Sequence, residues 1–527
     1  MKFNVDKHFT KSDLRRVQAL LLPVWLPKDE EKAASAPRGG ASASRSKKAP
    51  KTVFGQALPL LGKPDQKLIR AFVADKALKD GDVRMVKLSG APGNLCVAAI
   101  ADLSEKNFAL IVRQFVRKAK SEGLKNIGIY CDDFERGNIF AEKIAGLAAQ
   151  NALAAHFDFS EEFKTAPKEG WKKVETLTLF TYHDSRALHE ELARGITLGE
   201  AMNRCRTLAN YPAGEMSPEG LAEAAREVAK ETKNVAVTVF DEKRLKAEGM
   251  NAILAVGKGS ANPPRLIILE YKGGKDGEKP LTFVGKGVTF DSGGLNIKTG
   301  DSMEDMHLDM SGGAAVITAV GAIAKLGLPV NVMGLVPAAE NMPSGLSYRQ
   351  GDIIKVYGGK TIEVGDTDAE GRVILADAIE YAKTKKPALL VTIATLTGAV
   401  VIALGGRMAG LFVAGNKPLR DALEGIGEKS GDDVWPLPLN DDFEKDIEGK
   451  FADVTNTHKS NSRDGGASVA AAFLRHFAKP APFAHVDMAP RMTAMADEEH
   501  LAKGAVGFGV RYFVELAARW EEVKKAL

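Results

Sequence analysis

The sequence predicts an α/β protein of two domains, in which the larger C-terminal domain holds a mainly parallel sheet with helices on both faces and the smaller N-terminal domain is also α/β. Two observations lead to this prediction. Short apolar runs that suit buried strands alternate along the chain with longer stretches of helical periodicity. At 527 residues the chain also exceeds the usual size of one domain, so two units are expected.

The composition is that of a globular protein. Hydrophobic residues make up 45% of the chain and charged residues 27%, and 72 basic side chains nearly balance 68 acidic ones. The resulting net charge of +4 indicates no strong attraction to nucleic acid or to a membrane surface. The three cysteines are scattered, and neither a secretory signal nor an uninterrupted apolar span is visible, so we expect a cytoplasmic protein.

The first domain is expected to span residues 1–190. Strand-like runs such as LCVAAIA and NIGIYC alternate there with helical ones such as FALIVRQFVRKAKSEG. A further buried strand is predicted from Ala19 to Leu26, where the sequence reads ALLLPVWL. The stretch from Lys28 to Lys51 (residues 28–51) has almost no large apolar residues, which predicts a flexible insertion. We find no grouping of acids, bases or nucleophiles in this domain that suggests catalysis.

The second domain is expected to span residues 195–527. A helix is predicted from Gly195 to Asn210, and Ser217 followed by Pro218 marks the start of the next one. The strand-like runs beyond it are longer and more apolar, for example PRLIILEY, LTFVGKGVTF and ALLVTIATLTG. Because ligands bind beyond the carboxyl ends of the strands in such sheets, functional residues should directly follow these runs.

Charged side chains do gather at those positions, in three Gly-rich segments. They are Lys286, Asp291 and Lys298 in KGVTFDSGGLNIK, Asp309 in MHLDMSGGAA, and Asp368, Glu370 and Arg372 in GDTDAEGR. Four carboxylates meeting at one sheet edge would repel one another, and divalent cations would offset that repulsion. A pair of such ions can also activate a water molecule and polarise a carbonyl group. The alternative is that each acid is solvated or paired with a surface lysine.

Several segments also follow one another in a specific order along the chain. They are VGKGVTFDSGGLNIK, the Gly-rich segment at Asp309, TDAEGR, and ATLTGA from Ala394 to Ala399. These segments resemble the successive signatures of the leucyl aminopeptidase family. The resemblance covers most of the chain beyond about Ala201 and includes RTLANYPAGEMSP, GGASVAAAFL and AHVDMA. The first domain resembles the family only loosely.

This resemblance implies a metal-dependent aminopeptidase that acts on peptides through a water molecule bridging two divalent ions, Mn²⁺ or Zn²⁺. The implied metal ligands are Lys286, Asp291, Asp309, Asp368 and Glu370. Lys298 would stabilise the oxyanion, and Arg372 would hold a small anion such as bicarbonate that relays a proton. Because an amine binds a metal only when it is neutral, Lys286 would have to lose its proton.

The resemblance also implies how a substrate binds. The free α-amine of the substrate would bind a metal, and backbone atoms of Leu396 and Gly398 would orient the peptide. The apolar pocket for the first side chain would be formed by Met306, Thr395, Ala489 and Met492. Two flexible thioethers suit a preference for Leu-like or Met-like side chains, and ordinary core packing is the alternative for both methionines.

The sequence departs from the family pattern close to the expected site. Asp366 stands where the family usually has Asn, which adds a negative charge beside the expected ligands. Pro490 replaces a Gly that commonly follows the equivalent of Ala489, which bears on the shape of the pocket. None of the departures removes an expected ligand.

Two other functions stay open beside a broad aminopeptidase. One is a narrow dipeptidase, for example one that hydrolyses Cys-Gly. The other is a DNA-binding or regulatory protein of the same fold, which the basic stretch from Arg45 to Lys51 allows but does not specify. The family further implies a homohexamer, and nothing in the sequence indicates a membrane partner.

Overall fold

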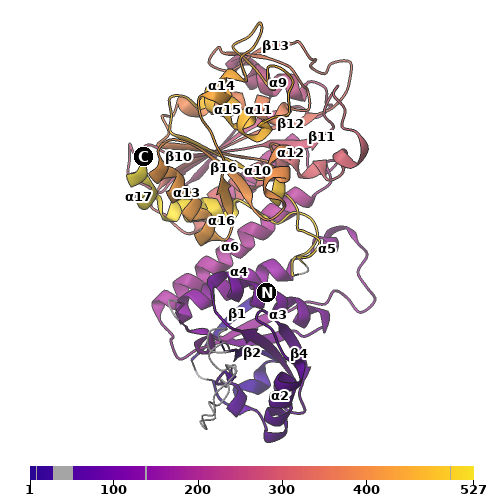
Figure 1. Ribbon diagram of the computed structural model, residues 1–527, viewed down its shortest axis with the longest axis vertical. Helices are drawn as coiled ribbons and strands as arrows, with labels where there is room; N and C mark the ends of the chain where they lie inside the picture. The colour runs from indigo at the N-terminus through magenta and orange to yellow at the C-terminus, as the bar shows by residue number, and fades with distance from the viewer. Residues whose placement is uncertain (8, 28–51, 137–138, 499) are drawn as a thin grey trace, which may run out of the picture. The chain divides into compact units, whose positions relative to one another are not determined.

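The computed structural model describes residues 1–7, 9–27, 52–136, 139–498 and 500–527. The chain divides into two compact α/β units, which agrees with the predicted fold class (Figure 1). The first unit comprises Met1–Glu200 and Glu499–Ala502, and the second comprises Ala201–Glu498 and Lys503–Leu527. The insertion predicted between Lys28 and Lys51, with its basic stretch, lies outside the described residues.

The first unit is built on a seven-stranded sheet of order β1-β7-β6-β2-β5-β4, in which β3 pairs with β2. Its strands are β1 (Lys2–Asp6), β2 (Ala19–Trp25), β3 (Val53–Phe54), β4 (Val83–Lys87), β5 (Asn94–Ile100), β6 (Asn126–Tyr130) and β7 (Thr176–Phe180). Its helices, with η marking 3-10 turns, are η1 (Asp13–Arg16), η2 (Leu58–Leu60), α2 (Lys63–Lys76), α3 (Glu105–Ser121), η3 (Cys131–Phe134), α4 (Ala141–His156) and α5 (Ser160–Phe163). Only β3 and β4 run antiparallel to their neighbours in this sheet, among the described residues.

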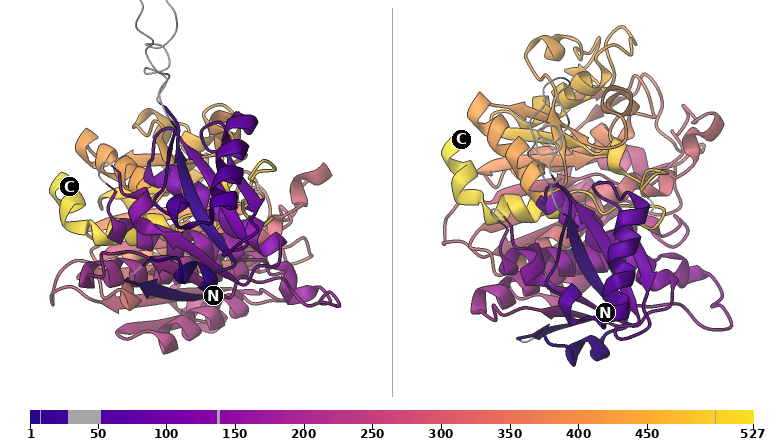
Figure 2. Two further views of the ribbon diagram at one scale, coloured as in Figure 1. Left: turned by 90° about the horizontal axis from the view of Figure 1, so that it is seen from below. Right: turned by 60° about the horizontal axis from the view of Figure 1, so that its bottom comes forward.

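Helices cover both faces of this sheet, as the central strand β2 illustrates. All of its side chains are buried, as the apolar run ALLLPVWL predicts. Because successive side chains of a strand point to opposite faces, Leu21 packs with α3 and α4 while Leu20 and Leu22 pack with α2. Figure 1 shows α2 and the α3–α4 pair on opposite sides of these strands, and Figure 2 shows the same indigo strands from two further directions.

The helix α6 (Arg186–Asn210) begins earlier than the predicted start at Gly195. Its first two turns, RALHEELAR, are rich in charge, so the apolar pattern alone hides them. The start signal is Ser185, whose hydroxyl accepts a hydrogen bond of 3.1 Å from the Leu188 backbone N–H. The start predicted at Ser217 is confirmed, because its side chain caps α7 (Pro218–Glu231).

The second unit holds a nine-stranded sheet of order β17-β16-β19-β15-β10-β12-β9-β8, in which β11 pairs with β12. The strands of this sheet are β8 (Val235–Phe240), β9 (Arg265–Lys272), β10 (Leu281–Gly285), β11 (Gly287–Asp291), β12 (Asn331–Asn341), β15 (Leu389–Ala394), β16 (Ala409–Ala414), β17 (Val434–Pro436) and β19 (Phe483–Asp487). The four central strands, β19-β15-β10-β12, are parallel to one another. At the two sides of this centre, β16 pairs antiparallel with β19 and β9 pairs antiparallel with β12, and β8 in turn pairs antiparallel with β9. A small second sheet consists of β13 (Ile353–Lys355), β14 (Thr361–Glu363) and β18 (Val454–Thr455).

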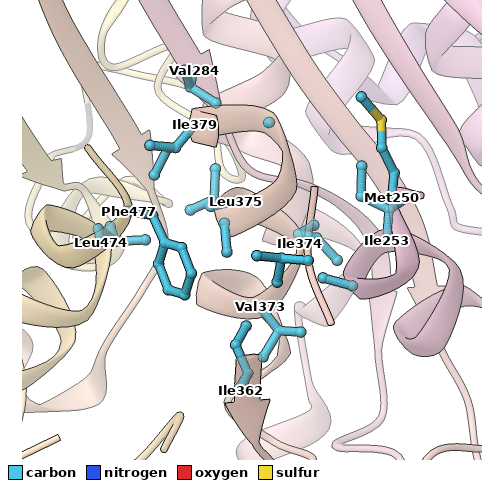
Figure 3. Packing of buried hydrophobic residues seen from close by; sticks show 14 of the residues in the cluster. Met250, Ile253, Val284, Ile362, Val373, Ile374, Leu375, Ile379, Leu474 and Phe477 are labelled. Carbon is cyan, nitrogen blue, oxygen red and sulfur yellow. The ribbon is translucent and has the colours of Figure 1, made fainter. Parts of the chain in front are cut away.

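Helices cover both faces of the large sheet as well. The helices and 3-10 turns of the second unit, besides α7, are α8 (Glu242–Glu248), α9 (Asn251–Gly257), η4 (Gly300–Met303), η5 (Met306–Met310), α10 (Ser311–Lys325), α11 (Glu370–Lys383), α12 (Gly398–Leu404), α13 (Lys417–Ser430), α14 (Asp442–Lys445), α15 (Gly466–Ala478), η6 (Ala489–Arg491), α16 (Val510–Ala518), α17 (Trp520–Val523) and η7 (Lys524–Ala526). In β10, Phe283 stacks on Phe513 of α16, whereas the next residue, Val284, joins the core around α11 on the other face. Figure 3 shows that core, with labelled side chains from α9, α11 and α15.

One stretch of the described residues, Met306–Lys325, is long and apolar enough to cross a membrane. In the structure it forms η5 and α10, and 89% of its apolar window is buried inside the second unit. Because α10 packs on β10 and β12, its apolar character is explained by its place in the core.

The run LTFVGKGVTF, predicted as one strand, is broken at Lys286 into β10 and β11. The α10 backbone comes close at this point and requires glycine, since a Cβ at Gly285 would lie 2.4 Å from the carbonyl oxygen of Gly312. The Lys286 N–H donates to the Ile393 carbonyl (3.0 Å), and the Lys286 carbonyl accepts from the Gly313 N–H (2.7 Å). The break lies at the carboxyl end of β10, where ligands bind in sheets of this kind.

Candidate metal centre

Three buried carboxylates meet at the carboxyl edge of the second unit's sheet. Asp291 ends β11, Asp309 lies in η5, and Glu370 is the first residue of α11, where the helix N-terminus favours an anion. One oxygen of each lies within 4.8 Å of the others, and the three residues are only 2%, 3% and 1% exposed. The structure therefore brings together three acids that lie far apart in the sequence.

Lys286 supplies the nearest positive charge to two of these acids. Its Nζ lies 2.7 Å from Asp309 Oδ2 and 2.7 Å from Glu370 Oε1, and it donates a hydrogen bond to the Thr395 carbonyl oxygen (3.3 Å). Burial lowers the pKa of Lys286, but the negative charges of Asp309 and Glu370 outweigh it and hold the pKa above its ordinary value. Without a metal, Lys286 is thus a protonated counter-ion.

Lys298 makes the second pair of ionic contacts at the site. Its Nζ lies 2.8 Å from Asp291 Oδ2 and 2.5 Å from Asp368 Oδ1. Burial lowers the pKa of Lys298, but the negative charges of Asp291 and Glu370 outweigh this effect, and the net result is a pKa above its usual range. Asp368 is more exposed than the three central acids, so this lysine connects the buried carboxylates to the solvent side of the site.

The donor set fits divalent cations. Burial raises the pKa of Asp309 to about 6 and that of Glu370 to about 8, which means that these acids are short of compensating positive charge. Asp309 Oδ2 and Glu370 Oε1 have no hydrogen-bond donor among the described residues besides the Lys286 ammonium group that is ion-paired with them. Buried oxygens in this state are suited to a hard cation such as Mn²⁺ or Mg²⁺, and also to Zn²⁺.

Neighbouring polar groups hold the carboxylates in place. Asp291 Oδ1 accepts hydrogen bonds from Asn341 Nδ2 and from the Gly293 N–H, each 2.9 Å long. Asp309 Oδ1 accepts a bond of 2.6 Å from the Thr395 hydroxyl. Gly371 leaves room for the Lys286 side chain, because a Cβ there would lie 2.5 Å from Lys286 Cε.

The segment that carries Asp368 and Arg372 is fixed by short-range turns and by Asn456. Asp366 Oδ1 accepts the Asp368 N–H (2.8 Å), which an Asn side chain at this position would do equally well. Asn456 Nδ2 donates to the Asp366 carbonyl (2.7 Å), and Arg372 Nη1 donates to the Asn456 carbonyl (2.9 Å). Arg372 is partly buried and its Nε, which is shielded from solvent, has no partner among the described residues, so part of its donor capacity is available.

The residues predicted to contact substrate lie after β15, at the start of α12, in η5 and in or just after η6. Thr395 and Leu396 follow β15, and Gly398 begins α12 in an exposed position. Met306 begins η5 and Met492 follows η6, and both are partly exposed. Ala489 begins η6 and packs against the small cluster around Val400 and Phe412. The Thr395 hydroxyl is already bonded to Asp309, so it lies at the metal site itself.

Sequence reasoning assigned no role to three residues that shape this site, namely Asn341, Asn456 and Asp487. Asn341 holds Asp291, and Asn456 holds the segment from Asp366 to Arg372. Asp487 ends β19 and accepts hydrogen bonds from the Leu396 N–H of the segment after β15 and from the Ala489 N–H at the start of η6. Asn341 and Asp487 could have been found from the sequence, because each is a polar residue at the carboxyl end of an apolar strand.

Comparison with known proteins gives a consistent result. Residues 203–514 match the catalytic domain of the cytosol aminopeptidase family. A probable cytosol aminopeptidase of Solibacter usitatus is 42% identical over 409 residues, which cover 77% of this chain and 82% of the relative. A probable cytosol aminopeptidase of Cenarchaeum symbiosum is 38% identical over 452 residues, which cover 84% of this chain and 90% of the relative.

Solved structures resemble the chain over most of its length. A tomato leucine aminopeptidase mutant superposes with a TM-score of 0.81 at 27% identity, covering 98% of this chain and 96% of its own. A bottromycin maturation enzyme in complex with Mn superposes with a TM-score of 0.77 at 30% identity, covering 85% of this chain and 96% of its own.

Proposed function

The chain belongs to the cytosol aminopeptidase family of metal-dependent aminopeptidases, and from this premise we propose which of its residues bind the metal and the substrate. Five residues hold two divalent ions in this proposal: Lys286, Asp291, Asp309, Asp368 and Glu370. The observation that carries it is the convergence of three buried carboxylates within 4.8 Å, two of which have an oxygen compensated only by the Lys286 ammonium group among the described residues. Bound divalent ions would activate a water molecule and polarise the scissile carbonyl group.

Lys286 changes its role when a metal binds. In the metal-free site it neutralises Asp309 and Glu370, and a cation that takes over this task makes the ammonium proton unfavourable. The neutral amine keeps two N–H groups, one of which can still donate to the Thr395 carbonyl. Lys286 is therefore positioned to exchange a proton for a metal ion with little movement of its side chain.

Lys298 and Arg372 are the proposed catalytic residues. Lys298 stays protonated because Asp291 and Asp368 hold its pKa high, and its ammonium group can stabilise negative charge on the carbonyl oxygen of the substrate. Arg372 keeps an unpartnered Nε in the described structure, which suits a small anion such as bicarbonate that passes a proton onward. No protein nucleophile is required.

The substrate is proposed to be a peptide with a free amino terminus. Backbone atoms of Leu396 and Gly398 orient it, and Met306, Thr395, Ala489 and Met492 surround its first side chain, which favours Leu-like and Met-like residues. Mn²⁺ is the first metal to test, because a structural relative is described in complex with Mn. A homohexamer in the cytoplasm is the assembly and location that we propose from the family and from the names of its relatives.

Leucine amide hydrolysis after metal removal tests this function. Protein stripped with a chelator should be inactive and should regain activity on titration with Mn²⁺ or Zn²⁺. Lys298→Ala should lower kcat by about 100-fold to 1,000-fold, because it removes one stabiliser of the oxyanion. Lys258→Ala, which removes an exposed lysine of the same unit, should leave kcat unchanged.

The result that contradicts the proposal is an absence of turnover with every metal tested. A narrow dipeptidase would instead leave leucine amide untouched and hydrolyse a dipeptide such as Cys-Gly. Comparing these two substrates under the same metal titration separates a broad aminopeptidase from a narrow dipeptidase.

A further inference from the structure

We propose that Asp487 is a positioning residue that fixes the backbone from Thr395 to Gly398 and thereby orients the peptide beyond its first residue. The inference rests on the proposed function, because it takes Leu396 and Gly398 as the groups that contact substrate. No hydrogen bond or ion pair joins Asp487 to a proposed metal ligand within the described residues, so its effect is exerted through the backbone.

The carboxylate of Asp487 is fully buried and accepts hydrogen bonds from three residues, Leu396, Thr397 and Ala489. Oδ1 accepts from the Leu396 N–H (3.0 Å) and from the Ala489 N–H (3.3 Å), and Oδ2 accepts from the Thr397 hydroxyl (2.7 Å). The described residues include no ion pair to this carboxylate, so these donors are its direct partners, while the Arg372 guanidinium interacts with its charge from farther away. A buried acid in this state holds its donors firmly, since hydrogen bonds to a charged group are stronger than those between neutral groups.

Two of the bonds at this strand end act on a single peptide group. The Thr395 carbonyl and the Leu396 N–H belong to the same peptide plane, and they point in opposite directions. Lys286 Nζ donates to this carbonyl, while Asp487 accepts from this N–H. The plane is therefore held from both sides, which fixes the orientation in which the backbone enters Leu396.

The third bond fixes the next residue. The Thr397 hydroxyl donates to Asp487 and accepts the Val400 N–H (3.2 Å), which makes Thr397 the N-cap of α12. Gly398 follows as the first residue of α12 and is exposed. Asp487 thus determines where α12 begins and where the backbone of Gly398 is presented.

Asp487 also holds the start of the segment that leads to Met492. Its bond to the Ala489 N–H lies at the first residue of η6, and η6 packs against α12. One carboxylate thereby connects the strand end at Leu396 with the proposed pocket residues Ala489 and Met492. This geometry predicts that loosening Asp487 will weaken binding of the peptide more than it weakens metal binding.

Three variants separate the contacts of this carboxylate. Asp487→Ala removes all of them. Asp487→Asn keeps an acceptor for the two N–H groups and loses the acceptor for the Thr397 hydroxyl. Thr397→Val keeps the carboxylate and its backbone bonds and removes the hydroxyl.

Asp377 offers a matched control. It is also fully buried and accepts three backbone N–H groups, from Ala252, Ile253 and Tyr357, at distances of 2.8 to 2.9 Å. It lies within α11 and belongs to the packing of α9 and α11. Asp377→Asn should therefore disturb stability without a selective effect on peptide binding.

The experiment measures kcat and KM for leucine amide and for Leu-Gly-Gly, together with Mn²⁺ affinity by calorimetry and Tm. Leucine amide ends at the scissile nitrogen, so only the tripeptide uses contacts beyond it. Asp487→Ala should raise KM for Leu-Gly-Gly by about tenfold or more, and KM for leucine amide by less than about threefold. Asp487→Asn and Thr397→Val should give intermediate increases of the same selectivity, with Mn²⁺ affinity unchanged.

Equal changes in KM for both substrates, or a loss of kcat at unchanged KM, would overturn the positioning role. If Asp487→Ala does not fold, the selectivity of Asp487→Asn and Thr397→Val decides the matter. Failure of the wild-type protein to hydrolyse either substrate would instead contradict the proposed function, so the two failures are distinguishable.

Discussion

Among the described residues, two groups of side chains each place three possible metal ligands within 4.8 Å of one another, one group in each unit. In the first unit the group is Asp132, Glu135 and His183, which follow β6 and β7. In the second unit it is Asp291, Asp309 and Glu370. Spacing alone does not tell them apart, but the contacts that each oxygen already makes do.

The acids of the first unit are occupied by the backbone and by a hydroxyl. Asp132 accepts hydrogen bonds from the Thr181 hydroxyl (2.6 Å) and the Tyr182 N–H (3.0 Å). Glu135 accepts from the Ala141 N–H (2.7 Å), and the His183 side chain is 56% exposed. These contacts are those of turns and helix starts, so this group is explained by the local fold.

The acids of the second unit are buried, close together and compensated mainly by lysine side chains. Asp309 Oδ2 and Glu370 Oε1 are paired with the Lys286 ammonium group and have no other donor among the described residues. A charge that only another side chain compensates can be compensated by a metal ion instead. The comparison teaches that a functional acid cluster is recognised by what its oxygens lack as well as by where they lie.

The largest expected effect follows from exchanging one acid in each group. Glu370→Gln should lower kcat/KM for leucine amide by about 1,000-fold or more, because a neutral ligand weakens a centre that contributes several kcal/mol. Asp132→Asn should leave kcat/KM within about twofold and lower stability by about 1 to 2 kcal/mol through lost hydrogen bonds. Steady-state kinetics and urea unfolding measure the two quantities, and a large loss of activity in Asp132→Asn would contradict the comparison.

A smaller effect is expected from the space around Lys286. In Gly371→Ala the new Cβ would lie 2.5 Å from Lys286 Cε, so the lysine must shift away from its carboxylates. Mn²⁺ affinity measured by calorimetry should fall by about 10-fold to 100-fold, the range typical of disturbed ligand support.

Gly425→Ala is the control for this change. Gly425 lies within α13, and a Cβ there would meet no atom within 4 Å. This variant should keep its metal affinity and gain up to about 1 kcal/mol of stability, because alanine is the better helix former. Equal loss of Mn²⁺ affinity in both variants would show that Lys286 does not need the space at Gly371.

The smallest expected effect concerns pH and the first unit. Burial raises the pKa of Asp133 from its ordinary 3.8 to about 6, although the Gln56 and Ala57 N–H groups oppose the shift. A carboxyl whose folded pKa is raised favours folding while it is protonated, and this contribution is lost as the pH rises from about 4 to about 6. Asp133→Asn carries no charge, so its free energy of unfolding relative to wild type should rise by about 1 to 3 kcal/mol between pH 4 and pH 7. Urea unfolding at several pH values measures this difference, and a constant difference would contradict a raised pKa.

Much of the fold follows from local sequence signals. The buried strand β2 follows from an unbroken apolar run, and the start of α7 follows from Ser217 ahead of Pro218. The ligand segments were predictable because parallel strands bring their carboxyl ends to one edge. The early start of α6 was missed because its first turns are charged and its cap, Ser185, lies outside the apolar pattern.

The remaining parts depend on contacts between distant segments. Asn341 and Asp291 are 50 residues apart, and Asp487 and Leu396 are 91 apart. No periodicity or motif spacing encodes such pairs, since they arise only when the strands have been ordered in the sheet. The same holds for the exact end of β10 within the run LTFVGKGVTF, where Gly285 lies close to the Gly312 backbone of a distant segment.

The central claim is that the second unit alone holds the metal ions, and counting bound Mn²⁺ by calorimetry on chelator-stripped protein tests it most directly. The account predicts two ions per chain for wild type and for Asp132→Asn, and fewer than two for Glu370→Gln. It would be contradicted if Asp132→Asn lost an ion, or if Glu370→Gln bound as many ions as wild type with unchanged affinity.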